Sequence, residues 1–244
     1  MTAPARSHAT PGARRQAARC VLAAAVLAAS CAAQAQVAGT LGVASVDRYR
    51  GMGTGDDGPV VRASAMLDVS VGAYGGISGL WRTRDAGLSR AEAMLGWSGR
   101  FGALPPEWGW DAALHRTHHV AAGDTDFTEA MLGLLGPDFA LRAWYAPHYF
   151  GGYMRTFYTE LNASHAIDAR WHVFGHAGWL HYGTAPDYQP RPPDRTDTLA
   201  GIGATLARWD VQLARDGILA GRARGGLDAR GRRAAWILSA SVAF

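Results

Sequence analysis

The sequence predicts an all-β protein, a transmembrane antiparallel β-barrel of about 12 strands. Three observations carry this prediction. One segment alternates strictly between apolar and more polar residues over the length of a membrane-crossing strand. About eleven further segments show related alternation between turn residues. The connections between the segments alternate between long and short.

The clearest strand is the segment Ala234 to Phe244. Trp236, Leu238, Ala240, Val242 and Phe244 are apolar and two residues apart, and smaller or more polar residues lie between them. Alternate side chains of a strand point to opposite faces, and tilted strands of 9–11 residues cross a membrane. A strand ending in Phe244 resembles the signal by which outer-membrane barrels are assembled, so the expected partners are outer-membrane lipids and the barrel assembly machinery. A core strand of a soluble β protein is the alternative.

The first 35 residues are expected to be a secretory signal peptide, which leaves residues 36–244 as the barrel domain. Four arginines and no acid precede an apolar run of 12 residues from Cys20 to Cys31, and Ala33-Gln34-Ala35 offers a small-residue cleavage site. The run is too short for a spanning helix. A lipoprotein signal is the alternative because Ser30 precedes Cys31, although Ala28 stands where such signals usually have Leu.

Cleavage after Ala35 changes the composition of the exported chain. Both cysteines, Cys20 and Cys31, would be removed, so no disulfide is expected. The chain has 24 basic and 20 acidic residues, and losing the four arginines of the signal leaves a net charge of zero. The basic pI is therefore no argument for a nucleic-acid partner. No later apolar run approaches the 18 residues of a membrane helix.

The alternation and the turn residues predict twelve strands. Their approximate extents are Val37–Arg50, Val60–Ser70, a strand ending at Trp81, Ala91–Ser98, Trp108–His115, Glu129–Leu134, Phe139–Tyr145, Phe157–Ser164, Trp171–Tyr182, Ala200–Leu206, a strand beginning near Trp209, and Trp236–Phe244.

The connections favour a membrane barrel over a soluble sandwich. The first, third, fifth, seventh, ninth and eleventh are mostly long and polar, among them Gly51–Pro59, Gly183–Asp197 and Asp216–Arg233. The others are mostly short, except Arg100–Glu107. Outer-membrane barrels keep short turns in the periplasm and long loops outside. An even strand number then places both termini in the periplasm and the protein in a bacterial outer membrane.

Three stretches resemble the TorF family of outer-membrane porins: S-V-D-R-Y-R-G at Ser45–Gly51, W-Y-A-P-H-Y-F-G-G at Trp144–Gly152, and Y-T-E-L-N at Tyr158–Asn162. The resemblance implies a signal peptide, a closed antiparallel barrel and a channel role. Asp47 stands where that family usually has Tyr, and the loops Ala185–Pro193 and Arg222–Arg233 look particular to this chain.

The polar strand faces are expected to line the lumen if the apolar faces meet lipid. The expected function is a porin-like channel for passive diffusion of small hydrophilic solutes. The alternative is a non-conducting structural or adhesive barrel that acts through its outer loops, with a lumen plugged by paired charges. Six acids against four arginines are too even to assign ion selectivity. The expected lumen-lining residues are Arg48, Arg50, Arg62, Asp68, Glu92, Asp111, Glu129, Arg142, Glu160, Asn162, Asp210 and Gln212.

The sequence predicts no enzyme, cofactor or metal site. His172 and His176 share a strand face but lie about 13 Å apart along an extended strand, too far to bind one ion together. His115, His118 and His119 could approach one another, but without a Cys or acid at ligand spacing. Ser164 and His165 are neighbours that point to opposite faces, and no G-x-S-x-G motif occurs.

Overall fold

The structure is a computed structural model that describes residues 36–50, 52–53, 58–69, 72–84, 87–120, 123–152, 154–183, 192–220 and 235–244. The expected signal peptide, nearly all of the Pro-rich loop Ala185–Pro193 and the Arg-rich loop Arg222–Arg233 lie outside these residues. No helix within the described ranges has the length and apolar character needed to cross a membrane.

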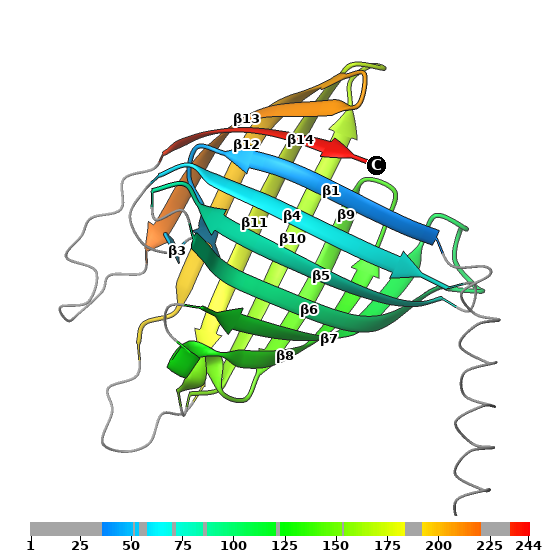
Figure 1. Cartoon of the computed structure of the whole chain (residues 1–244). Helices are drawn as coiled ribbons and strands as arrows, with labels where there is room; N and C mark the ends of the chain where they lie inside the picture. Colours follow the sequence, from blue (N-terminus) through cyan, green and yellow to red (C-terminus); the bar gives the residue numbers. More distant parts are fainter. Residues whose placement is uncertain are drawn as a thin grey trace, which may run out of the picture.

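Twelve antiparallel strands form a closed barrel, as predicted (Figure 1). Strand β1 pairs with β4 on one side and with β14 on the other, and each remaining strand pairs with its neighbours in the chain. The barrel strands are β1 (Gln36–Ala44), β4 (Val60–Asp68), β5 (Ala73–Arg82), β6 (Gly87–Arg100), β7 (Gly109–His119), β8 (Phe127–Leu135), β9 (Phe139–Ala146), β10 (Thr156–Ala166), β11 (Trp171–Tyr182), β12 (Arg195–Leu206), β13 (Trp209–Ala220) and β14 (Trp236–Ala243).

The barrel closes where the two ends of the chain meet. Val43 of β1 faces Ala240 of β14 and Val61 of β4, and Gly39 exchanges backbone hydrogen bonds with Phe244. The start of β1 and the end of β14 therefore lie at the same end of the barrel (Figure 1). Closure leaves every barrel strand with a partner on each side, which removes the unpaired edges of an open sheet.

Exposed large apolar side chains lie on the outward face of the strands, as the alternation predicted. In β14, Leu238 is 57% exposed and Trp236 is 60% exposed, whereas Ser239 lies on the opposite face and is half-buried. The same outward set continues around the barrel with Ile77, Leu95 and Leu132. An apolar exterior of this kind suits hydrocarbon rather than water.

The connections differ between the two ends of the barrel. One end, here called the loop end, carries residues 45–59, 83–86, 120–126, 147–155, 183–194 and 221–235 between successive strands. The other, the turn end, carries residues 69–72, 101–108, 136–138, 167–170 and 207–208, together with the start of β1 and the end of β14. The long-and-short alternation read from the sequence is therefore present in the fold.

The prediction that the first strand continues to Arg50 was wrong. Strand β1 ends at Ala44, and the chain then enters the barrel, where Val46 and Asp47 are buried. Two-residue strands β2 (Arg48–Tyr49) and β3 (Met52–Gly53) pair there as a separate small sheet. The backbone of Arg50 has φ of 49°, a left-handed conformation that cannot continue a strand.

Two strands extend beyond their predicted limits. Residues Arg195 to Asp197 were expected in a loop, but they pair with β11 and β13 and belong to β12. Asp216 was expected to begin a loop, but β13 continues to Ala220. Both extensions add a carboxylate to the barrel interior, Asp197 and Asp216, and each is about 5% exposed.

Candidate functional site: the barrel interior

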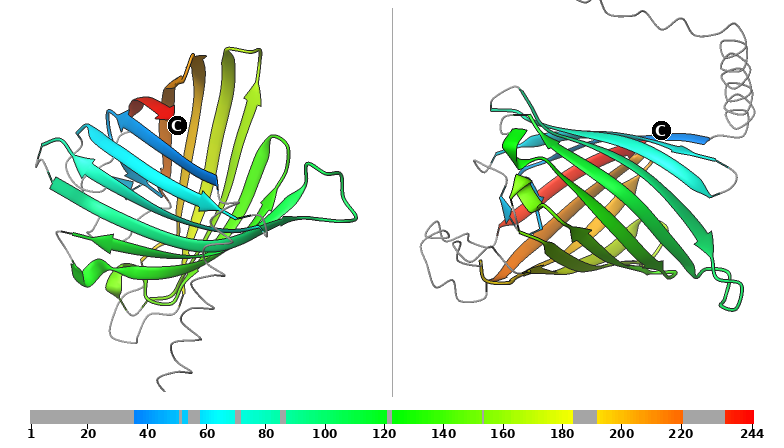
Figure 2. Two further views of the ribbon diagram at one scale, coloured as in Figure 1. Left: turned by 45° about the vertical axis from the view of Figure 1, so that its right-hand side comes forward. Right: turned by 90° about the horizontal axis from the view of Figure 1, so that it is seen from below.

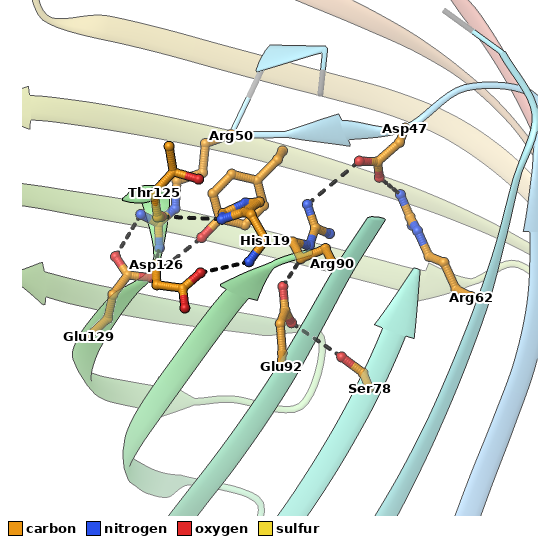
Figure 3. Close-up of polar contacts among 11 residues, drawn as sticks. Asp47, Arg50, Arg62, Ser78, Arg90, Glu92, His119, Thr125, Asp126 and Glu129 are labelled. Atoms are coloured by element: carbon orange, nitrogen blue, oxygen red, sulfur yellow. Dashed lines mark hydrogen bonds and ion pairs between the residues drawn. The ribbon is translucent and has the colours of Figure 1, made fainter. Parts of the chain in front are cut away.

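A short piece of chain, residues 45–50 with 52–53, lies inside the loop end and is here called the inner segment. Its best-anchored residue is Arg50, whose guanidinium donates two hydrogen bonds of 2.7 Å to the carboxylate of Glu129 on β8. Both side chains are nearly buried, at 6% and 3% exposure. A bidentate arginine–carboxylate pair fixes direction as well as position, so it holds the inner segment to the wall (Figure 3).

Three further strands bind the inner segment through ion pairs. Asp47 accepts a hydrogen bond from Arg62 on β4 and lies 3.6 Å from a guanidinium nitrogen of Arg90 on β6. Arg48 donates to Asp216 on β13 at 2.7 Å. These contacts reach strands on different sides of the ring, so the segment spans the lumen rather than lying along one wall. Figure 3 shows the contacts of Asp47 and Arg50.

Aromatic rings surround the Arg50 guanidinium. Its carbon lies 4.4 Å from the ring centre of Tyr158 and 5.1 to 5.6 Å from those of Tyr49, Trp144 and Tyr149. Cation–π attraction strengthens where water is excluded. The cation is therefore stabilised on its faces by rings and at its edge by a carboxylate.

The loop end is further filled by an apolar cluster. Phe127, Ala146 and Leu180 are at most 1% exposed, and Tyr149 packs edge-on against Phe127 at 5.0 Å between ring centres. Tyr149 comes from the short 3-10 helix η2 (Tyr149–Gly151), which packs near a second one, η1 (Gly123–Thr125). The two short helices lie at this end of the barrel in Figure 2. The described part of the loop end is thus a packed core inside the barrel.

A cavity of about 920 Å³ lies inside the barrel next to the inner segment. Its lining runs from Tyr49 and Arg50 of the inner segment to the turn 136–138 at the turn end. The inward side chains of β10 follow the same course: Thr156 is 1% exposed, Glu160 is half-buried and Ser164 is exposed. The interior therefore changes from packed to open along a single strand.

A polar network forms one wall of the cavity. Tyr158 donates its hydroxyl hydrogen to Asp197, and His176 contacts Asp197 through Nε2 at 2.7 Å and Asn162 through Nδ1 at 2.8 Å. Gly178 lies opposite, where a Cβ atom would come within 2.6 Å of both Tyr158 and Asp197 side-chain oxygens. The glycine thus provides the space in which three strands share one network.

The residues predicted to line the lumen fall into two groups in the structure. Ten of the twelve expected residues lie on barrel strands, each on the face opposite the exposed apolar side chains. The other two, Arg48 and Arg50, belong to the inner segment. Seven of the twelve line the cavity: Arg48, Arg50, Glu92, Glu129, Glu160, Asn162 and Gln212.

The remaining five lie around the cavity. Arg62 pairs with Asp47, and Arg142 lies 4.0 Å from Glu160. Asp68 is exposed at the end of β4. The other two carboxylates accept hydrogen bonds from neutral side chains: Asp111 from the hydroxyl of Tyr74, and Asp210 from the amide of Gln212.

Several interior residues were not predicted. Asp197 and Asp216 were assigned to loops, so their inward direction could not be read. Trp144 lay within the predicted strand Phe139–Tyr145 but was not named as lumen-lining, yet it lines the cavity and donates from Nε1 to Glu160 at 3.2 Å. The strand rule could have found it, because Trp144 is two residues from Arg142 and shares its face.

The histidines separate between the two faces. His118 is exposed and contacts Asp126 through Nδ1 at 2.7 Å, whereas His115 lines the cavity. Asp126, between η1 and β8, also accepts a hydrogen bond from the backbone of His119, and these bonds, that of His118 first, lower the pKa of its carboxyl. Ser164 and His165 point to opposite faces. The described residues include no group of three or more potential ligands that could hold a metal ion.

Comparison with known proteins shows similarity in fold but not in sequence. No family model matches the sequence, and no curated protein matches it. A solved KdgM porin is similar with a TM-score of 0.53 and 8% identity, and a NanC porin with 0.54 and 10%. A KdgM porin in complex with disordered oligogalacturonate gives 0.51 and 7%. Each match covers 86% of this chain and 99% of the other.

At these identities the similarity concerns the fold alone. The narrower resemblance to the TorF family therefore stays a prediction. The chain has the closed antiparallel barrel architecture of the bacterial outer-membrane porins.

Proposed function

We propose that this protein is an outer-membrane channel through which small hydrophilic solutes diffuse passively. The observation that carries the proposal is the cavity of about 920 Å³, with charged and polar groups in its wall, inside a barrel whose exterior is apolar. A protein of this construction gives polar solutes a wet path across hydrocarbon. The similarity to solved porins supports the same function.

We expect the inner segment to be the narrowest part of the proposed path. The cavity lining stops at Tyr49 and Arg50, where ion pairs and rings fill the described loop end. Solutes would have to pass beside this segment or displace it. We therefore expect small conductance, with transitions between levels when the ion pairs open and close.

The test is single-channel recording of refolded protein in planar bilayers, with swelling of vesicles in small sugars as a second measurement. Stepwise conductance and swelling are expected. If neither occurs with protein that is shown to be folded, the non-conducting structural or adhesive barrel becomes the better account. In that account the buried ion pairs of the inner segment are a permanent plug, and a lipid-hydrolysis assay would be the remaining check for catalysis.

We also propose the export route that the sequence predicts. Cleavage after Ala35 would release a chain beginning at Gln36, and the strand ending at Phe244 would engage the barrel assembly machinery, with the turn end in the periplasm. Mass spectrometry of the exported protein should find Gln36 first. A lipid on Cys31 would instead show a lipoprotein.

A further inference from the structure

The cavity lining contains more acidic than basic side chains. Two arginines, Arg48 and Arg50, belong to it. Three histidines, His115, His172 and His176, also line it and are neutral at sufficiently high pH. The lining carboxylates are Glu92, Glu129, Asp138, Glu160, Asp197 and Asp216.

Arginines offset four of these carboxylates. Arg50 pairs with Glu129 and Arg48 with Asp216, while Arg90 lies 2.9 Å from Glu92. Arg142 lies 4.0 Å from Glu160. Arg90 and Arg142 do not themselves line the cavity, so even when both are counted, four arginines face six carboxylates.

The two carboxylates in excess pair with histidines. Asp197 contacts His176 at 2.7 Å, and Asp138 contacts His165 at 2.8 Å near the turn-end opening. Neutral imidazoles leave both negative charges in place. Asp111 and Asp210, which accept hydrogen bonds from neutral groups nearer the turn end, add to the negative potential there.

We infer that the cavity admits cations and excludes anions, so that the solutes of this channel are small cationic or neutral molecules. The inference about transported solutes rests on the proposed function. The charge preference of the cavity can be tested without it. The lining keeps six carboxylates, because Asp138, Asp197 and Asp216 take the places of the expected Asp68, Asp111 and Asp210. Of the four expected arginines, however, only Arg48 and Arg50 line it, and this loss of two positive charges makes the balance less even than the sequence suggested. A water-filled cavity whose walls carry charges of one sign raises the local concentration of ions of the opposite sign.

Trp144 provides a direct probe of the cavity. All nine tryptophans lie in the described residues, and Trp144 is the one among them that lines the cavity. Quenching of its fluorescence by caesium and by iodide, each normalised to free tryptophanamide, compares a cation with an anion at one position. The signal of Trp144 is the difference between the wild-type protein and Trp144→Phe, both folded in detergent at pH 8.5.

We expect normalised quenching by caesium to exceed that by iodide about fivefold at ~0.1 M salt, where two charges within a Debye length are only partly screened. The double variant Glu92→Gln/Asp138→Asn removes two lining charges without touching a group bonded to Trp144, and should bring the ratio near one. The control Glu107→Gln/Asp168→Asn removes two exposed charges from turns at the same end. It should keep the preference.

Iodide quenching equal to or stronger than caesium quenching would overturn the inference, as would equal loss of preference in both double variants. Reversal potentials in a potassium chloride gradient then address transport. Conductance with a cation preference supports both proposals, whereas conductance without it rejects the cationic solute class. A caesium preference in a protein that never conducts rejects the proposed channel and leaves the cavity preference standing.

Discussion

The two halves of the barrel interior use charge differently. At the loop end, Arg50 and Glu129 form a pair that is at most 6% exposed, and rings pack against it. Toward the turn end, Arg142 and Glu160 lie 4.0 Å apart and are 30% and 15% exposed beside the cavity. The first arrangement fixes a structure, because a buried charge without its partner is costly. The second leaves its charges available to water and solutes.

This difference separates a packed, ion-paired region from a cavity within one barrel. The inner segment supplies Asp47, Arg48 and Arg50, and strands from several sides of the ring supply their partners. The turn-end half has no counterpart of this segment among the described residues. Substitutions of the same chemical type should therefore act on stability in one half and on solute traffic in the other.

The largest expected contrast compares two glutamates. Glu129→Gln leaves the buried Arg50 without its carboxylate, and we expect a loss of about 3–5 kcal/mol in the free energy of unfolding. The control, Glu160→Gln, alters a looser pair beside the cavity and should cost under about 1 kcal/mol. Denaturant unfolding in lipid vesicles measures both. Equal losses of unfolding free energy in the two variants would show that charge has the same role in both halves of the interior.

The comparison of the halves requires a lipid-facing exterior, which β14 tests at adjacent positions. Leu238→Arg would place a charge in hydrocarbon at a cost of about 2–4 kcal/mol near the midplane. Ser239→Arg points inward, beside Gln212, and should be tolerated. Folded protein recovered from outer membranes is the readout. Greater loss for Ser239→Arg would reverse the assignment of the faces.

The constriction proposed at the inner segment predicts a change in conductance. Tyr49→Ala removes a ring that lines the closed end of the cavity and lies 4.7 Å from the guanidinium carbon of Arg90. Single-channel conductance should rise severalfold. Phe174→Ala, which enlarges the open half instead, should change conductance little. A conductance that responds only to the Phe174 substitution would place the constriction in the turn-end half rather than at the inner segment.

The smallest expected effect concerns pH at the loop end. Hydrogen bonds from His118 and the His119 backbone lower the pKa of Asp126 in the folded state. Their contribution is therefore complete above the ordinary aspartate pKa of about 3.9 and is lost as pH falls through the lower folded value. Asp126→Asn should remove a small part of the acid destabilisation seen in unfolding curves below about pH 4. An unchanged pH profile would contradict the assignment.

The sequence predicted the barrel well because its walls obey a local rule. Alternation in segments such as Trp236 to Phe244 depends only on which face meets lipid, so strand number and faces followed from it. The inner segment does not obey that rule. Its direction depends on partners such as Glu129 and Asp216, which lie 79 and 168 residues away from the arginines that they bind. No local pattern encodes those pairings. The start of β12 at Arg195 likewise depends on pairing with β11 and β13 rather than on its own sequence.

The most direct test of the closed and open halves is thiol labelling along β10. Residues 36–244 contain no cysteine, so single cysteines can replace the inward residues Thr156, Glu160 and Ser164, with outward Leu161 as the lipid-facing control. A charged, water-soluble thiol reagent should react fast at position 164, more slowly at 160, and scarcely at 156 or 161. Fast labelling at 156, or equal rates at all three inward positions, would contradict a lumen that is packed at the loop end and open at the turn end.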